Sequence, residues 1–363
     1  MAPMATSRRE FLLSTTAFLA AAGCGFGTSS NSDVENIGGP GVRGKQVLEG
    51  ELSLAVPSSA LPRRIVSDFR DATGVHVQVQ RVGTDEDLLL GIGAGATGSV
   101  DAVLVGDQVL TQLIDRELVE PLDRSLIPGR DGIAPPYDDP PGDGGLRHGI
   151  PQDLTPVGFA ALTTAPIRQD SWRGFFRLAE EYPGRVDVPD DAATVIGAVL
   201  VSLGHRWNTD DGGDLDEAAA ELHRLRPALI VRSTPRIVAA SGAMAALSEG
   251  SRYRSAPSQV RFVVPIEGTI VRVRSWCIPI LAPHPVVAHA WLANAISPGT
   301  ARAWTVAIGR ATPVESVIAQ LPASIVDDPA VYPPSDAIPN LIYQDVSADG
   351  LARREEIWAQ VAS

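Results

Sequence analysis

The sequence predicts an α/β protein made of two doubly wound lobes joined by a hinge. Two observations support this fold class. Strand and helix patterns alternate between residues 51 and 118 and again between residues 156 and 264, which predicts sheets with helices on both faces. The chain also has to cross between these regions at least twice, near 150–156 and near 265–269. Two lobes that share several crossings form a hinge beside a cleft.

The first lobe is predicted from three strands that each lead into a helix. Strict alternation marks a strand at 75–82, and the nearly continuous apolar run at 100–105 is typical of a buried parallel strand. Asp107 is expected to cap the helix that follows. The expected elements are strands at 51–56, 75–82 and 100–105, and helices at 62–71, around 88–90 and at 109–118.

The second lobe repeats this order of elements. Asp190 and Asp191 are expected to cap a long apolar helix at 192–203, because carboxylates stabilise the positive end of a helix dipole. The other expected elements are strands at 156–162, 186–189, 228–231 and 259–264, and helices from 171, at 217–225 and at 237–247.

The segment from 265 to 314 is expected to return to the first lobe. An alternating strand at 271–276 leads into two apolar helices at 286–296 and 300–308, and an exit segment follows. The expected lobe boundaries are 46–150 plus 268–311 for the first lobe and 151–267 plus 312–363 for the second.

The N-terminus predicts export. Twin arginines stand before an apolar run at 11–22, which resembles a twin-arginine signal and is too short to anchor a protein across a bilayer. Small residues before Cys24 resemble a lipobox, so we expect a signal peptide at 1–23, an acylated Cys24 and a flexible tether at 24–45. Cleavage by ordinary signal peptidase is the alternative, since the usual leucine is missing. The expected location is the outer face of the cytoplasmic membrane or the periplasm, with a lipid anchor.

Composition and motifs argue against several classes of function. The formal net charge of −13 argues against a nucleic-acid partner, since phosphate binding needs a basic surface. No nucleophile elbow, HExxH motif or phosphate loop occurs. His284 and His289 are five residues apart and do not share a helical face, which argues against a metal site. We therefore expect neither an enzyme nor a cofactor.

Several short landmarks recur in an order and spacing typical of one family. They are Ile150-Pro151, Ser171-Trp172, the segments 188–192 and 275–279, Ser297-Pro298 and Thr312-Pro313. With the export signal, they make the chain resemble the extracytoplasmic solute-binding proteins of bacterial ABC importers, in particular the spermidine/putrescine-binding type. The resemblance implies a type II periplasmic-binding-protein fold and a monomer that carries a small solute without catalysis. It also implies docking on a membrane permease with its ATPase.

The polyamine site of that family uses carboxylates for the ammonium groups and aromatic rings for the methylene chain. Carried over by spacing, one carboxylate remains as Asp191, while its companion position holds Thr194. Three aromatic positions fall at or beside Ser58, Gln108 and Ser248. The resemblance thus implies a cleft that has lost most of the family's aromatic groups.

The largest departure from the polyamine pattern is a set of arginines. By the same resemblance, Arg272 and Arg274 take the positions of a paired aromatic and carboxylate, and Arg310 takes that of a further aromatic. Positive charge at these positions would repel a polyammonium ion, whereas an arginine fork suits a carboxylate or a phosphate. The substitutions favour an anionic solute.

Two variants of this hypothesis stay open. Asp153, Asp191 and Glu267 would offset the positive charge and suit a zwitterion. Alternatively, Arg272 and Arg274 point outward as exposed charges on an edge strand, because alternation does not say which face is the cleft. The expected ligand-binding residues are Ser58, Gln108, Asp153, Asp191, Ser248, Arg272, Arg274 and Arg310.

Two other functions also stay open. Loss of the family's aromatic groups would suit a non-transport lipoprotein, a sensor or scaffold with a degenerate pocket. A secreted hydrolase would need an activated nucleophile beside a base, and no such arrangement is recognisable in the sequence.

Overall fold

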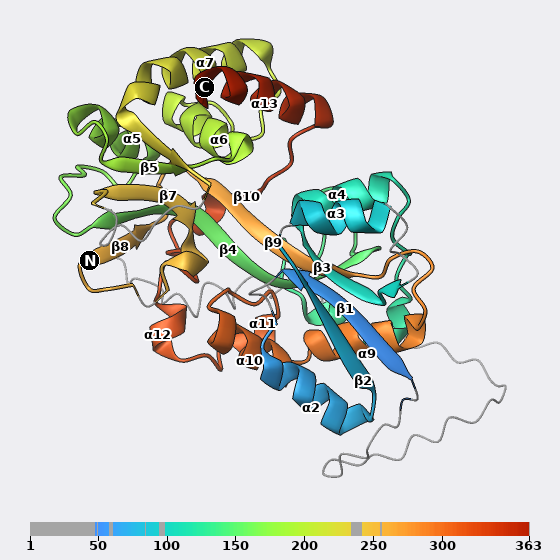
Figure 1. The fold of residues 1–363 in the computed structure, drawn as a ribbon. Coiled ribbons are helices and arrows are strands. Elements are labelled where there is room, and N and C mark those ends of the chain that lie inside the picture. Colours follow the sequence, from blue (N-terminus) through green and yellow to red (C-terminus); the bar gives the residue numbers. More distant parts are fainter. Residues whose placement is uncertain are drawn as a thin grey trace, which may run out of the picture.

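In the computed structural model, one mixed sheet runs through both lobes (Figure 1). The structure describes residues 48, 50–57, 61–83, 85–93, 99–233, 242–254 and 256–362. Within these ranges, ten strands form the sheet in the order β2-β1-β3-β9-β4-β7-β5-β6, with β10 paired to β9 and β8 paired to β4. The predicted signal peptide, Cys24 and the tether lie outside the described residues.

The first lobe is the parallel α/β unit that the sequence predicts. Its strands are β1 (Glu51–Pro57), β2 (His76–Val82) and β3 (Ala102–Gly106), and its helices are α2 (Arg63–Thr73), α3 (Asp85–Gly93) and α4 (Asp107–Asp115). β1 pairs in parallel with both β2 and β3. Helix α4 begins at Asp107 itself, with Gly106 in the capping position, so Asp107 stands inside the first turn and the prediction that it caps the helix is wrong.

The second lobe repeats the parallel arrangement with one unexpected strand. Its strands are β5 (Val186–Pro189), β6 (Leu229–Arg232), β7 (Ala245–Glu249) and β8 (Val260–Val263), and its helices are α5 (Trp172–Glu181), α6 (Ala192–Leu203), α7 (Gly212–Leu225) and α13 (Ala348–Ala362). The helix predicted at 237–247 is wrong where it can be compared, because its end belongs to β7. β7 lies between β4 and β5, and a short apolar run in such a buried position does not distinguish strand from helix.

Three strands connect the lobes. They are β4 (Gly149–Leu162), β9 (Thr269–Cys277) and β10 (Leu341–Tyr343). β4 pairs with β9 in its first half and with β7 in its second half, and its register shifts between Pro151 and Asp153. The crossings at β4 and β9 match the predicted hinge positions. β10 has no counterpart among the predicted elements, because three residues carry too little periodicity to be recognised.

The remaining helices cover the first lobe. They are α9 (Pro285–Ala295), α10 (Pro298–Ile308), α11 (Glu315–Ile318) and α12 (Ala323–Val326). Short 3-10 helices occur along the whole described chain: η3 (Arg124–Leu126), η4 (Arg130–Gly132), η5 (Arg226–Ala228), which follows α7 in the second lobe, η6 (Gly250–Arg252) and η7 (Ile338–Asn340). In Figure 1, α2, α9, α10 and α11 lie below the sheet, while α3 and α4 lie above it. Among the described residues, no helix is both long and apolar enough to cross a bilayer.

Two large apolar cores match the two lobes. One gathers β1, β3, α2, α9 and α10, and the other gathers β5, α5, α6, α7 and α13. The first core also contains Val314, Val317 and Tyr332, although the predicted boundary assigned residues 312–363 to the second lobe. Ile357 and Trp358 of α13 do belong to the second core. Residues 314–326 therefore pack with the first lobe, whereas Ala330 packs against β7 and β8, and the other boundaries stay predictions.

Candidate ligand-binding cleft between the lobes

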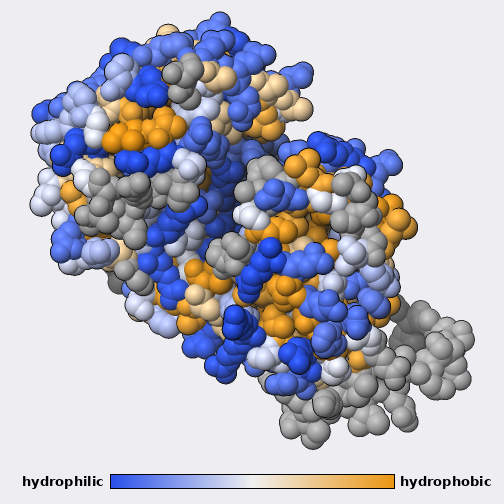
Figure 2. Space-filling view, viewed as in Figure 1, coloured by the Kyte–Doolittle hydropathy of each residue, from blue (hydrophilic) through white to orange (hydrophobic). Residues whose placement is uncertain are grey.

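The molecule is hollowed between its two lobes, above the place where β10 pairs with β9. Figure 2 shows this hollow lined by hydrophilic residues, in contrast to the apolar patches on the lobe below and to its right. Proteins bind small solutes in such concave sites, where a few convergent polar groups fix the orientation of the ligand. The buried polar groups between the lobes come from β4, β7, β9 and the starts of α4 and α6.

Asp153 of β4 is the centre of a buried ionic cluster. Its carboxylate is fully buried and accepts hydrogen bonds from Arg274 Nε at 2.8 Å, Arg310 Nε at 2.6 Å and Trp304 Nε1 at 2.8 Å, and Arg274 Nη2 makes a further bond. Burial alone would raise the pKa of Asp153, but the guanidinium groups of Arg274 and Arg310 hold it below its usual value. This carboxylate is therefore ionised and satisfied on both oxygens.

Arg310 extends the cluster into the second lobe. Its Nη1 donates to Glu249 Oε2 of β7 at 2.9 Å, and its Nη2 donates to the carbonyl of Arg272 at 3.3 Å. Burial alone would lower the pKa of Arg310, but Asp153 and Glu249 raise it above its usual value. Burial likewise would raise the pKa of Glu249, and Arg310 holds it down. Arg310 thus stays charged and links the hinge to β7.

Arg272 points to the first turn of α6. Its Nη2 donates to Asp191 Oδ2 at 2.9 Å and to Thr194 Oγ1 at 2.6 Å. Asp191 also caps this helix, because its Oδ1 accepts from the Thr194 N–H at 3.0 Å. This cap confirms the sequence prediction. Thr194, which stands where the resemblance places a second carboxylate, therefore orients Asp191 toward the arginine.

Some guanidinium nitrogens stay available for a solute. The Arg272 side chain is 19% exposed, and its Nε and Nη1 have no hydrogen-bond partner among the described residues. The Arg274 side chain is 12% exposed, and its Nη1 has none there either. An acidic group that entered the cleft would meet these donors without breaking the bonds to Asp153.

The structure contradicts an outward position for the two strand arginines. β9 is an interior strand, flanked by β4 on one edge and by β3 and β10 on the other, so Arg272 and Arg274 are not surface charges on a sheet edge. Carboxylates of Asp153, Glu249 and Asp191 neutralise the cluster. The large positive field expected from the sequence is therefore cancelled locally.

Other predicted ligand residues lie away from the ionic cluster. Ser248 is buried and its hydroxyl has no partner among the described residues, while the adjacent Glu249 makes the contact to Arg310. Side chains alternate between the two faces of a strand, so a shift of one position along β7 decides which side chain reaches the cluster. Glu267 is also elsewhere, because its carboxylate accepts from the backbone N–H groups of Trp172 and Arg173 at the start of α5. Ser58 lies outside the described residues.

A notch in the sheet adds groups that the sequence did not reveal. β4 covers one edge of β9 from Val271 to Cys277. On the other edge β3 ends with Gly106 opposite Arg274, and β10 ends with Tyr343 opposite Val271. The carboxyl ends of β3 and β10 therefore face each other across a gap of two residues, the kind of switch point where open α/β sheets bind ligands.

Asp107 stands in this notch as the first residue of α4. Burial raises the pKa of its carboxyl to about 6, although the Arg272 guanidinium and the backbone N–H groups of Gln108 and Val273 act to lower it. The neighbouring Gln108, a predicted ligand residue, has a buried amide nitrogen without a partner among the described residues. Its position at the end of β3 was the signal that pointed here.

The next question is whether titratable side chains among the described residues could bind a metal ion. Among the described residues, no group of three or more His, Cys, Asp or Glu side chains is placed to hold a metal ion. His284 and His289 act separately: His284 contacts Asp101, and His289 accepts from the Asp123 N–H.

Comparison with known proteins decides the family. The model of the family described as bacterial extracellular solute-binding protein matches residues 64–333. The chain belongs to this family. Among curated relatives of this solute-binding protein, the spermidine/putrescine-binding periplasmic protein 1 of Haemophilus influenzae is 25% identical over 312 residues, which cover 83% of this chain and 86% of that protein. The spermidine/putrescine-binding periplasmic protein of Escherichia coli is 24% identical over 297 residues, 79% of this chain and 85% of that protein.

Solved structures confirm the fold class of this solute-binding protein. The spermidine/putrescine transporter substrate-binding protein of Streptococcus pneumoniae has a TM-score of 0.78 and 22% identity, with 86% of this chain and 99% of that chain covered. A putative spermidine/putrescine transporter protein of Listeria monocytogenes has a TM-score of 0.75 and 22% identity, with 86% and 98% covered. The predicted two-lobed, type II periplasmic-binding fold is thus confirmed.

Proposed function

We propose that this solute-binding protein delivers a small polar solute to an ABC importer, and that the solute binds in the cleft on Arg272 and Arg274. The family membership and the resemblance to spermidine/putrescine importer proteins support the transport role. The lobes, the strands that link them and the polar hollow support a cleft that closes on its ligand by hinge motion. Its partners would be the membrane permease and ATPase, with the binding protein acting as a monomer.

The free nitrogens of Arg272 carry the proposal on the chemistry of the solute. An arginine fork in a partly dry cleft pairs well with a carboxylate or phosphate oxygen. A polyamine would meet these donors as a like charge. It would also find the carboxylates Asp153, Glu249 and Asp191 already paired with arginines. The proposed solute therefore has an acidic group, either alone or as part of a zwitterion.

Relatives allow this departure from polyamines. The curated relatives with spermidine/putrescine names are at most 25% identical to the chain. The same fold also occurs in a GABA receptor with a TM-score of 0.65 and 17% identity, and in a protein in complex with agropinic acid with a TM-score of 0.62 and 15% identity. The fold itself therefore accommodates solutes of different charge.

A thermal-shift screen tests the proposed function. Polyamines, dicarboxylates, amino acids and phosphorylated compounds would be compared at equal concentration, because a ligand that binds only the folded state raises the melting temperature by mass action. We expect stabilisation by compounds with an acidic group. Stabilisation by spermidine alone would refute the acidic solute.

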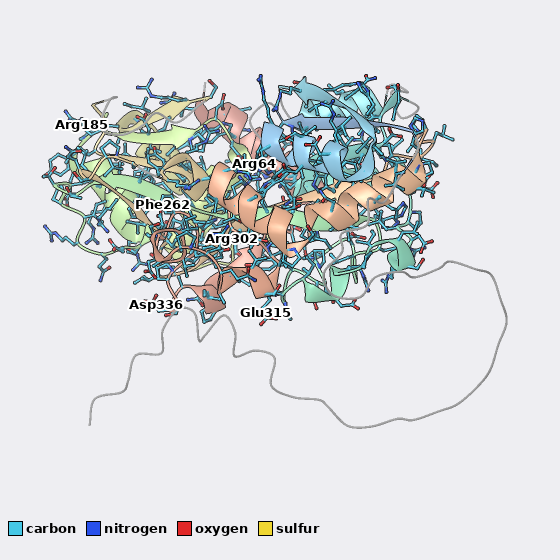
Figure 3. All side chains as sticks on the ribbon, turned by 90° about the horizontal axis from the view of Figure 1, so that it is seen from below. Arg64, Arg185, Phe262, Arg302, Glu315 and Asp336 are labelled. Atoms are coloured by element: carbon cyan, nitrogen blue, oxygen red, sulfur yellow. The ribbon has the colours of Figure 1, made fainter. Side chains whose placement is uncertain are left out.

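Two arginine variants connect the screen to the cleft. Arg272→Gln should remove the shift caused by acidic compounds, because it deletes both free donors. Arg64→Gln is the matched control, since Arg64 lies on α2 on the underside of the first lobe (Figure 3) and its side chain is 86% exposed. An unchanged shift in Arg272→Gln would remove this residue from the site.

The pairing of Asp153, Glu249 and Asp191 with arginines favours one second candidate, a non-transport lipoprotein with a degenerate pocket. It would show no shift with any class of compound while the protein remained folded. Co-purification with a permease–ATPase pair in membranes would argue against it.

We also propose that the protein is exported by the twin-arginine route and anchored through an acylated Cys24. The N-terminal sequence pattern supports this. Replacing Cys24 with alanine should move the protein from the membrane fraction to the soluble fraction, and intact membrane retention of Cys24→Ala would contradict the anchor.

A further inference from the structure

The notch between β3 and β10 contains buried polar atoms that nothing in the described part of the chain satisfies. Asp107 Oδ2 and Tyr343 Oη are both buried and lack a hydrogen-bond partner there. The neighbouring Gln108 Nε2 is also buried without a partner. Buried polar atoms in folded proteins are nearly always paired with protein or with ordered water. Several unpaired atoms at one point of the sheet therefore indicate a position that another molecule fills.

The strand register brings Asp107 and Tyr343 together. Gly106 pairs with Arg274 and Tyr343 pairs with Val271 on the same edge of β9, a separation of about 10 Å at the strand rise of about 3.3 Å per residue. Asp107 continues β3 into this gap. Burial raises the pKa of the Tyr343 hydroxyl, and nearby Tyr137, Asp107 and Asp138 raise it further. The hydroxyl therefore keeps its proton at neutral pH and can both donate and accept.

The notch is suited to a cationic group, whereas Arg272 is suited to an anionic one. Two carboxylates, Asp107 and Asp138, act on Tyr343, and the Tyr137 ring packs edge-on against the Tyr343 ring with centroids 6.1 Å apart. Carboxylates beside aromatic rings attract an ammonium group, through charge and through the ring faces. Arg272 follows at once on β9, with donors left for an acidic group. Positive and negative subsites therefore lie side by side at one end of the cleft.

We propose that this notch binds a cationic, hydrogen-bond-donating group of the solute, with Asp107 Oδ2 and Tyr343 Oη as its acceptors, while the acidic group of the same solute lies on Arg272. The solute class is thus a zwitterion whose amino and acidic groups are separated along a short chain. This inference rests on the proposed function for the acidic end and adds the residues that select the other end.

A matched series of four-carbon compounds tests the inference. Succinate, 4-aminobutyrate and 1,4-diaminobutane differ only in their end groups, and their dissociation constants would be measured by calorimetry on the purified protein. We expect 4-aminobutyrate to bind at least tenfold more tightly than either of the other two. Tighter binding of 1,4-diaminobutane would overturn the inference.

Variants of the notch decide which residues select the amino group. Asp107→Asn should weaken 4-aminobutyrate at least tenfold and leave succinate unchanged or tighter, because only the cationic end loses its partner. Tyr343→Phe should weaken 4-aminobutyrate about threefold to tenfold while keeping the aromatic ring. Asp68→Asn on the exposed surface of α2 is the matched control, and melting temperatures confirm that each variant is folded.

The outcomes separate this inference from the proposed function. If acidic compounds bind and Arg272→Gln abolishes their binding, but Asp107→Asn does not change the preference for 4-aminobutyrate, the notch holds only water and the inference fails alone. If no member of the series and no compound of the wider screen binds, the proposed function fails and the inference fails with it.

Discussion

The buried polar cluster around Asp153 and the notch at Asp107 and Tyr343 lie on opposite edges of β9. They differ in how many of their polar atoms are hydrogen-bonded within the protein. The cluster around Asp153 is complete: both carboxylate oxygens and most guanidinium nitrogens are bonded to other side chains. The notch at Asp107 and Tyr343 is incomplete, with buried oxygens that find no partner in the described part of the chain. A complete network holds strands in place, whereas an incomplete one leaves its bonding capacity for a ligand.

This difference explains why the arginines alone do not define the ligand. Arg274 and Arg310 mostly serve the hinge, because they link β9 and the segment after α10 to Asp153 of β4 and Glu249 of β7. Arg272 belongs to both regions, since it contacts α6 on one side and borders the notch on the other. The following predictions separate the two roles, beginning with the largest expected effect and ending with the smallest.

Asp153→Ala should be the most damaging change. It leaves the Arg274 guanidinium without a carboxylate partner and Arg310 with Glu249 alone, and removal of one partner from a buried ion pair costs about 3–5 kcal/mol. The free energy of unfolding from urea denaturation measures the loss. The control is Asp131→Ala, whose side chain is 95% exposed and which should cost under about 0.5 kcal/mol. Equal effects of the two variants would contradict a structural role for the cluster.

Asp107→Asn should stabilise the empty protein above pH 6. The pKa of Asp107 is raised from 3.8 to about 6 in the folded state, so the folded protein holds this proton between pH 4 and pH 6 while the unfolded chain has lost it. Stability therefore falls as pH rises through this range. Asparagine removes the fall, and the variant should exceed the natural protein by about 1–3 kcal/mol at pH 7.5 and match it below pH 4.

Urea denaturation at several pH values measures this difference. A gain that is constant across pH would show that the Asp107 carboxyl does not titrate in the folded protein. Destabilisation at every pH would show that the carboxylate already has a partner, and that the notch is as complete as the Asp153 cluster.

Trp304→Phe should have a moderate effect on the complete region. The variant keeps most of the buried ring but removes the indole N–H that donates to Asp153 Oδ2 at 2.8 Å. Loss of a hydrogen bond to a charged group costs about 1.5–3 kcal/mol, and the smaller ring leaves some unfilled space in addition. Thermal melting at pH 7 measures the change, and a loss well below this range would show that the two arginines satisfy Asp153 by themselves.

Tyr343→Phe should have the smallest effect on stability. Its hydroxyl has no partner among the described residues, so deletion of the oxygen removes no bond and relieves an unsatisfied buried group. We expect a change within about 0.5 kcal/mol by urea denaturation, in contrast to the weaker solute binding predicted for the same variant. A loss above about 1 kcal/mol would show that the hydroxyl is bonded within the protein.

The sequence by itself determined the two-lobed α/β class, the hinge crossings at β4 and β9, and the aspartate cap of α6. These features follow from local signals, namely alternation, apolar helical spacing and capping residues. It also placed Asp153, Asp191, Arg272, Arg274 and Arg310 in one region, and the structure does bring these five together.

The tertiary structure alone decided which groups meet. Glu249 reaches Arg310 and Ser248 does not, because side-chain direction reverses at every residue of a strand. Glu267 accepts from the first backbone N–H groups of α5, and the neutralising role falls to Glu249. Asp107 and Tyr343, more than two hundred residues apart in the sequence, share a notch only because β3 and β10 end on the same edge of β9. Such pairings depend on long-range register, which no local pattern in the chain specifies.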